Sequence, residues 1–550
     1  MAIRALFRRL FVNKFAHHAL LAGLIATLLL GGIQLRRWTW EKTRHVRFQH
    51  DIVNGFYWGS ETLTEARQLS SNEISTNSWT AFFRGYFALY DQVKREAYEK
   101  DYRLDYPPLR LLVMSIWAKE VRTEFPGVDD GHPHYVGVLL KTNLLCELIS
   151  AVAIFLLVRF WVRRTTGVMP ARVWRIFPPE HRAWICGLAA AAAVWLEPSL
   201  ILDAHGWPQW DIWIVPFYLF AVLAALKNRW LVCGCLLAAG AMFKGQLLLV
   251  APFFILWPLW QKEWTRAMQM LAGFTATVAL IVSPWLLRNP VAWTAVAVVG
   301  GATWIFCSGR RLRHLGTWVA LLTALAVFAI GFFDGGSFAW LQIGFVYGSE
   351  HYPYLFISSC YNLPSLLSNL GWSLKDVFWS AQLGCLHFAI TLQWTLRLLY
   401  LSTLALCACC AAQHMRNRDP RLLIAVAMPW LLMFALLGQM HERYLVWGAV
   451  VSTVAFAVSV RLSILHFVVS LASLTMIAHV MLIDKKLNPT LEAIQFLNVL
   501  RPYASGLVLA CVAVCLWDAL SVRPPILFQS RRYLWLEPAS LSLGTAAEEV

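Results

Sequence analysis

The pentapeptide Asp105-Tyr106-Pro107-Pro108-Leu109 ends a polar, charged and aromatic segment that lies between two apolar runs. Consecutive prolines hold the backbone extended, and proline suits the first turn of a helix. Apolar residues follow at helical spacing over 109–117, so the sequence predicts a rigid corner between a loop and a helix. Asp105 and Tyr106 would lie at the positive end of that helix dipole, which stabilises anions. The alternative is a plain helix start beside a membrane.

The chain as a whole is strongly apolar. Of its 550 residues, 59% are hydrophobic and 14% are charged, whereas a soluble domain carries about 25% charged residues. Apolar runs near the length that crosses a bilayer recur along the chain. The net charge is +16, but the basic residues gather beside apolar runs, so we expect membrane lipid and no nucleic acid as a partner.

These runs predict an all-α polytopic membrane protein with about 14 transmembrane helices. The expected spans are 17–35, 137–158, 183–200, 212–226, 230–243, 247–260, 270–288, 291–306, 317–333, 384–410, 422–438, 445–460, 463–482 and 503–520. Basic residues in six connecting segments and at both chain ends predict cytoplasmic termini. The basic cluster 36–47 is an exception, and we expect it to lie on lipid headgroups outside the first span.

This topology divides the chain into two parts. Residues 1–460 are predicted to form the catalytic transmembrane core, with 36–135 as a large first extracytoplasmic loop. Residues 461–550 would form C-terminal transmembrane helices and a cytoplasmic tail. Most cysteines lie within apolar runs, so they predict small buried side chains and not a disulfide framework.

Polar residues that could carry chemistry fall on the predicted outer face. Asp51 lies in an apolar and aromatic stretch where burial could raise its pKa toward that of a general base, or it is an ordinary solvated carboxylate. The second outside turn combines Asp203, His205 and Gln209 with two tryptophans. This composition suits stacking on sugar rings and hydrogen bonds to hydroxyls. It also suits a simple interfacial anchor with Asp211 as a helix cap.

Cationic residues occur at two further membrane boundaries. Lys244 lies between two short apolar runs, and His441-Glu442-Arg443 is flanked by apolar residues on both sides. Ionisable residues at such positions are costly and mark functional sites. Arg443 could bind a phosphate bidentately together with His441, or it could only pair with Glu442. Together these residues predict a site where a lipid-borne anion meets a polar substrate.

Four of these stretches resemble motifs of the GT-C glycosyltransferases that use polyprenyl-phosphate sugars. The similarity is closest to the dolichyl-phosphate-glucose-dependent glucosyltransferases of N-glycan assembly and their bacterial relatives. The matching stretches are Asp105–Leu109, Pro198–Asp211, Lys244 with Gln246, and His441-Glu442-Arg443. The resemblance implies a GT-C-like bundle with Asp51 as the catalytic base, on its spacing from Trp58. Val53 and Tyr57 stand where the family has Glu and His.

The predicted function is an inverting hexosyltransferase. It would move a sugar from a polyprenyl-phosphate donor to the hydroxyl of a lipid- or glycan-linked acceptor. Lys244, His441 and Arg443 would bind the donor phosphate, and Asp51 would take the acceptor proton. The residues expected to position the substrates are Asp105, Tyr106, Asp203, His205, Gln209 and Glu442.

Cationic side chains can neutralise a phosphate leaving group, so no cofactor is expected, although the carboxylates leave a divalent metal open. The predicted location is the bacterial inner membrane with an extracytoplasmic active site, or the endoplasmic reticulum membrane in a eukaryote. Two other classes remain open at this point. One is a multi-span transporter or lipid flippase, and the other is a polysaccharide polymerase or ligase.

Overall fold

The architecture is almost entirely helical. The computed structural model describes residues 14–44, 49–69, 78–96, 104–125, 133–165, 179–309, 314–354, 359–383, 386–484 and 491–522. Within them, seven helices are long and apolar enough to cross a membrane, and five more are apolar but shorter. This confirms the predicted all-α polytopic membrane protein.

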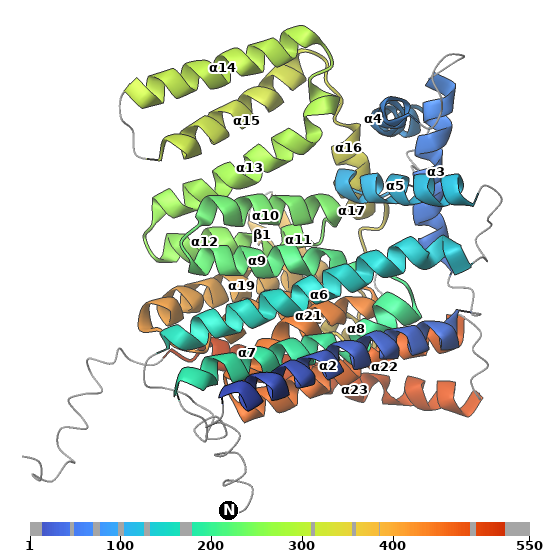
Figure 1. The fold of residues 1–550 in the computed structure, drawn as a ribbon, viewed down its shortest axis with the longest axis vertical. Helices are drawn as coiled ribbons and strands as arrows, with labels where there is room; N and C mark the ends of the chain where they lie inside the picture. Colours follow the sequence, from blue (N-terminus) through green and yellow to red (C-terminus); the bar gives the residue numbers. More distant parts are fainter. Residues whose placement is uncertain are drawn as a thin grey trace, which may run out of the picture.

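Each predicted span overlaps at least one helix of a single bundle, in which the long helices lie side by side (Figure 1), but several spans, such as 183–200 and 247–260, contain two helical elements. These helices are α2 (Lys14–Thr43), α6 (Pro133–Arg164), α7 (Pro179–Trp195), α9 (Val215–Leu226), α10 (Trp230–Phe243), α12 (Pro252–Trp260), α13 (Trp264–Leu286), α14 (Pro290–Gly309), α15 (Leu315–Phe333), α19 (Leu392–Asn417), α20 (Leu422–Leu436), α21 (Leu445–Ser452), α22 (Val460–Asp484) and α23 (Leu491–Leu520). Short segments join several of them: α8 (Pro198–Ile201), η3 (Leu202–Gly206), η4 (Asp211–Ile214), α11 (Leu247–Val250), α16 (Ala339–Leu341), η5 (Gln342–Val346), α17 (Tyr347–His351), α18 (Leu363–Asn369), η6 (Glu442–Tyr444) and η7 (Thr453–Ala457).

The predicted loop 36–135 contains three helices, which are α3 (Gln49–Leu69), α4 (Trp79–Glu96) and α5 (Pro108–Glu124). They lie together at one end of the bundle (Figure 1). Helices α3 and α5 approach closely at Gly59, where an added Cβ would lie 2.2 Å from the carbonyl oxygen of Met114. The segment is therefore a helical cap on the bundle and not an extended loop.

The expectation that Arg36 lies on lipid headgroups is wrong. Helix α2 continues past the apolar run, and Arg36 is only 2% exposed within it. Its guanidinium donates a hydrogen bond to Glu147 of α6 and lies 4.0 Å from the ring centroid of Trp195. A buried carboxylate on a neighbouring helix compensates the charge, which a rule based on loop composition does not detect.

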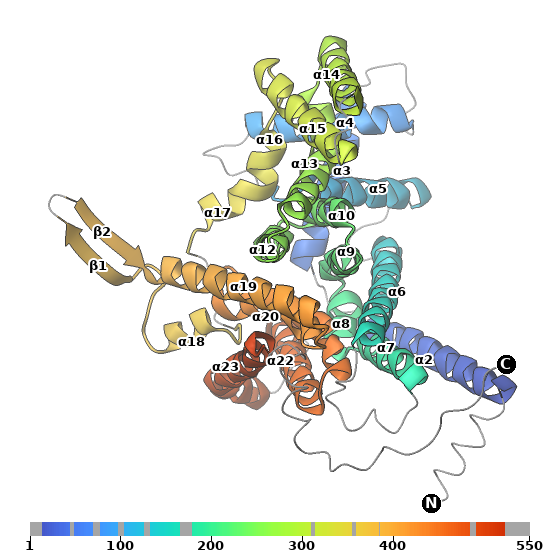
Figure 2. The same cartoon turned by 90° about the vertical axis from the view of Figure 1, so that its left-hand side faces the viewer.

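The predicted span 384–410 is also wrong at its start. An antiparallel hairpin of β1 (Val377–Leu383) and β2 (Leu386–Thr391) precedes α19 and projects from the bundle (Figure 2). Its register pairs Trp379 with Ile390 and Ala381 with Phe388. Apolar residues alternate with polar ones over 379–383 at the period of a strand, and α19 begins only at Leu392.

Candidate functional site

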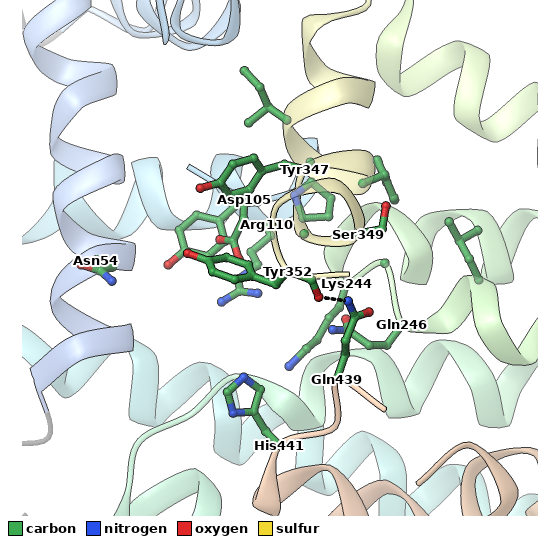
Figure 3. Close-up of a pocket in the computed structure, with 18 of the residues that line it drawn as sticks. Asn54, Asp105, Arg110, Lys244, Gln246, Tyr347, Ser349, Tyr352, Gln439 and His441 are labelled. Atoms are coloured by element: carbon green, nitrogen blue, oxygen red, sulfur yellow. Dashed lines mark hydrogen bonds between the residues drawn. The ribbon is translucent and has the colours of Figure 1, made fainter. Parts of the chain in front are cut away.

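A polar pocket of about 890 Å³ lies at the end of the bundle that carries α3 and α5. Its walls come from α3, the start of α5, the turn between α10 and α11, the segment η5–α17, and the chain before α21. Lys244 and His441 lie on one side, and Asp105 and Arg110 lie on the other (Figure 3). The structure therefore brings together five of the predicted site residues: Asp105, Tyr106, Lys244, His441 and Arg443.

Two cations of this pocket share one carboxylate. The Lys244 ammonium donates a hydrogen bond to Asp211 Oδ1, and Arg443 Nε lies 2.9 Å from Asp211 Oδ2. The Asp211 side chain is fully buried, and its backbone carbonyl accepts a 2.7 Å hydrogen bond from Trp447 Nε1. This trio carries a net charge of +1, and Asp211 fixes where both cations stand.

Aromatic rings complete the surroundings of these cations. The Lys244 ammonium lies 4.6 Å from the ring centroid of Tyr444 and 4.9 Å from that of Trp447. Tyr444 and Trp447 stack at 4.5 Å, and the Arg443 guanidinium lies 5.2 Å from the ring of Trp207. Such contacts contribute about 0.5–2 kcal/mol each. These rings stabilise the Lys244 and Arg443 cations at the pocket wall without the need for further carboxylates.

The proline corner forms as predicted. Pro107 is extended, with φ −63° and ψ 159°, and α5 begins at Pro108. The hydroxyl of Tyr90 donates to the Tyr106 carbonyl at 2.5 Å, and that of Tyr86 donates to the Pro108 carbonyl at 2.7 Å. Burial raises the pKa of both phenols well above the ordinary value, so they remain donors. Helix α4 thereby fixes the backbone that presents the exposed Asp105 side chain to the pocket.

Arg110 is a pocket residue that the sequence reasoning missed. Its guanidinium lies between two rings, 4.1 Å from the centroid of Tyr106 and 4.4 Å from that of Trp210. A basic residue in the first helical turn after the proline corner was the available signal. It adds a third cation to the pocket lining, beside Lys244 and Arg443.

Asp203, His205 and Gln209 are buried and do not line this pocket. They belong to an irregular stretch that contains the π-helical turn η3, a feature frequent at functional sites. The Asn143 amide donates 2.8 Å hydrogen bonds to the carbonyls of Ala204 and Gln209. This stretch leads directly into Asp211, so it acts as the scaffold for the shared carboxylate.

Glu147 is a second residue that the sequence reasoning missed. Its side chain is buried in α6, where one oxygen lies 3.1 Å from His205 Nε2 and the other accepts from Arg36. An acidic residue inside an apolar run was the signal, because such residues are costly in a membrane. The network ties α2 and α6 to the turn that carries His205.

Glu442 lies behind the pocket wall and is 7% exposed. It accepts a hydrogen bond from the Ser359 hydroxyl, and its other oxygen lies 3.9 Å from His441 Nδ1. Burial raises the pKa of this carboxyl, but the nearby His441 ring and the hydrogen bond from Ser359 outweigh burial and leave the pKa below its ordinary value. Glu442 is therefore ionised and holds the His441 ring at the pocket.

Asp51 lies in α3, one turn before Asn54, which lines the pocket. The Asp51 side chain is outside the described residues, so its role stays a prediction. As for metals, the parts of the chain that the structure describes contain no group of three His, Cys, Asp or Glu side chains arranged to hold an ion.

The fold and the pocket define an integral membrane protein with a cationic, aromatic site at one end of a helical bundle. Residues 104–300 match the sequence model of Glycosyltransferase family 87. The matched range begins at the proline corner and includes Asp211 and Lys244, whereas His441 and Arg443 lie beyond it. The match supports a membrane glycosyltransferase. A comparison of the chain with curated proteins finds no match.

Proposed function

We propose that this protein is an inverting glycosyltransferase of the GT-C type. It transfers a hexose from a polyprenyl-phosphate sugar to the hydroxyl of a lipid- or glycan-linked acceptor. The observation that carries the proposal is the convergence of Lys244 and Arg443 on Asp211, in one pocket with Asp105. A pocket with cations, aromatic rings and a carboxylate suits a phosphate, a sugar ring and an acceptor hydroxyl together.

The charges of the pocket fit this donor. A polyprenyl-phosphate sugar is a phosphodiester with one negative charge, which the +1 trio of Lys244, Arg443 and Asp211 balances. Cleavage of the sugar–oxygen bond adds charge to the departing phosphate, which as a monoester carries about −1.5 to −2 at pH 7. His441 and Arg110 line the same pocket and stabilise that added charge, which lowers the barrier for departure.

A carboxylate takes the proton from the acceptor hydroxyl as that oxygen attacks the anomeric carbon in line with the departing phosphate. The attack forms the new glycosidic bond, breaks the bond to the phosphate oxygen, and inverts the anomeric carbon. Asp51 is the base that the family resemblance implies, and Asp105 is a carboxylate that lines the pocket. Base catalysis of this kind contributes about 10²–10⁴-fold.

The remaining predicted residues support this arrangement. Tyr106 positions substrate beside Asp105, and Glu442 orients His441. Asp203, His205 and Gln209 shape the turn that delivers Asp211. Since cationic side chains neutralise the phosphate, the step needs no metal. The pattern of basic connecting segments favours an extracytoplasmic pocket in a bacterial inner membrane, or in the endoplasmic reticulum if the source is a eukaryote.

A donor screen with purified protein in nanodiscs tests the proposal. Polyprenyl-phosphate hexoses labelled in the sugar are incubated with membrane-extracted acceptors, and the release of polyprenyl phosphate is measured together with the anomeric configuration of the product. We expect release for one hexose, with inversion. If no lipid-phosphate hexose is consumed in nanodiscs while the same protein in sealed liposomes moves the labelled lipid intact across the bilayer, the protein is a flippase and the proposal is wrong.

Two variants test which carboxylate is the general base of the proposed transfer. Asp51→Asn should reduce transfer by about 10²–10⁴-fold while donor binding and melting temperature stay near those of the unaltered protein. Asp105→Asn is the matched variant, because it removes a pocket carboxylate with the same change in volume and charge. An active Asp51→Asn protein beside an inactive Asp105→Asn protein would make Asp105 the base.

A further inference from the structure

A second recess lies at the opposite end of the bundle from the polar pocket. It encloses about 430 Å³ between the C-terminal part of α6 and the end of α9. Helix α10 runs from that end toward Lys244 and has 14 residues, which spans about 20 Å at 1.5 Å per residue. The recess is therefore separate from the site described above.

Four cations line this recess: Arg159, Arg163, Arg164 and Lys227. The Arg164 guanidinium lies 4.1 Å from the ring centroid of Phe160, and the Lys227 ammonium lies 5.6 Å from the same centroid. Arg159 stacks on Trp184 at 3.8 Å. Aromatic rings of the bundle thus hold cations from two helices around one space.

Carboxylates do not balance these charges in the part of the chain that the structure describes. None of the four cations forms an ion pair with an Asp or Glu there, and Arg159 Nε is buried without a hydrogen-bond acceptor among the described residues. Like charges in one recess repel one another, so a bound anion would be stabilised.

The walls of the recess select among anions. Leu156, Phe160 and Leu223 supply apolar surface beside the cations. One turn before Leu156, Val152 is 46% exposed, and Leu148 and Leu145 continue the exposed apolar surface along α6. A ligand that places a phosphate among the cations and an acyl chain along α6 satisfies both surfaces, whereas free phosphate satisfies only the first.

We propose that this recess binds the headgroup of an anionic phospholipid. Its phosphate would lie among Arg159, Arg163, Arg164 and Lys227, with its acyl chains along the exposed face of α6. Basic recesses between membrane helices bind anionic headgroups in this way. The proposal does not depend on the chemistry of the polar pocket.

Lipid binding to delipidated protein in detergent tests the proposal. Phosphatidylglycerol and phosphatidylcholine of the same acyl composition are titrated separately, and the retained lipids are counted by native mass spectrometry. The test variant combines R159Q, R163Q, R164Q and K227Q. The control variant combines K262Q, R266Q, R416Q and R418Q, which removes the same charge from other helix ends. A third titration repeats the phosphatidylglycerol series with inorganic phosphate present.

We expect the unaltered protein and the control variant to retain phosphatidylglycerol in preference to phosphatidylcholine. The test variant should bind phosphatidylglycerol at least tenfold more weakly. Equal losses in the test and control variants would show a diffuse charge effect and overturn the proposal. Displacement by an equal concentration of inorganic phosphate would overturn it in favour of a free-anion site. If the fourfold variant does not fold, the double variant R163Q/K227Q, which alters two exposed side chains, replaces it with the same expected direction.

Discussion

Arg443 Nε lies 2.9 Å from Asp211 Oδ2, and the other oxygen of the same carboxylate accepts from Lys244. The two cations come from opposite halves of the chain, and Asp211 is fully buried between them. A buried carboxylate shared by two cations fixes their positions and leaves one positive charge for an anionic ligand. Its removal should therefore affect both the fold and the proposed transfer.

We predict that Asp211→Asn lowers the rate of polyprenyl phosphate release by about 10²–10³-fold. The substitution leaves the Lys244 and Arg443 side chains close together without the Asp211 carboxylate between them, so the melting temperature should also fall. Asp518→Asn is the control, because it removes a 2.5 Å ion pair with Arg461 in another part of the bundle and should preserve the rate. An Asp211→Asn protein with an unaltered rate would exclude the trio as the donor site.

The second prediction concerns pH. The pKa of Glu442 lies below its ordinary 4.5, so the folded state binds this proton less readily than the unfolded state. The ionised carboxylate then contributes stability above pH 4.5, and that contribution is lost as pH falls through the lowered pKa. We expect the melting temperature of the unaltered protein to fall more steeply below pH 4.5 than that of Glu442→Gln.

Ser359→Ala provides the matched control for that measurement. The Ser359 hydroxyl donates to Glu442 and lowers its pKa, so its removal should shift the acid loss of stability to higher pH. Identical melting profiles for Glu442→Gln and the unaltered protein between pH 3.5 and 7 would contradict the lowered pKa of Glu442 in the folded state.

The third prediction concerns the buried pair of Arg36 and Glu147. Removing one partner takes away the closest opposite charge of the other in a buried site, which costs about 3–5 kcal/mol. We expect Glu147→Gln and Arg36→Met each to lower the free energy of unfolding by this order. The double variant Arg36→Met/Glu147→Met should be more stable than either single variant, because neither charge remains. The measurement is urea unfolding of the protein in mixed micelles. If the losses in unfolding free energy of the two single variants simply add in the double variant, the Arg36–Glu147 pair is contradicted.

The fourth prediction concerns the crossing of α10 and α13. A Cβ added to Gly234 would lie 2.0 Å from the Met270 carbonyl oxygen, and one added to Gly273 would lie 2.1 Å from the Leu231 carbonyl oxygen. Small residues permit such close helix approach in membranes. Gly273→Val should therefore separate the helices, lower the melting temperature and displace Lys244 at the end of α10.

Gly301→Ala is the control for this crossing. Gly301 lies within α14, and an added Cβ would meet nothing within 4 Å. Alanine favours a helix over glycine by about 1 kcal/mol, so this variant should be as stable as the unaltered protein or slightly more stable. Equal stability for Gly273→Val would refute the close crossing.

Much of the fold could be predicted because the deciding information is local. Seven of the described helices are long and apolar enough to cross a membrane, and backbone groups in lipid must pair within a helix. The two prolines before Leu109 set the start of α5 in the same local way. The hairpin 377–391 was missed because a short apolar alternation resembles the beginning of an apolar span when only its composition is considered.

The candidate site was predicted in part. Lys244, His441 and Arg443 were recognised because polar residues stand out in apolar surroundings, and Asp105 and Tyr106 because they precede the proline corner. All five line one pocket. The role of Asp211 was not recognised, because it resembled an ordinary helix cap. Its partners come from distant segments, and only the packing of α10 and α21 beside η4 brings them to it.

The sequence by itself determined where the chain forms helices and where the proline corner lies. It also determined which ionisable residues stand in apolar surroundings, where they are costly and mark functional sites. The tertiary structure decided which charges meet, including Arg443 with Asp211 and Arg36 with Glu147. The physical reason is range. Hydropathy and backbone preferences act within a few residues, whereas an ion pair depends on how helices far apart in the sequence pack and on how well their surroundings exclude water.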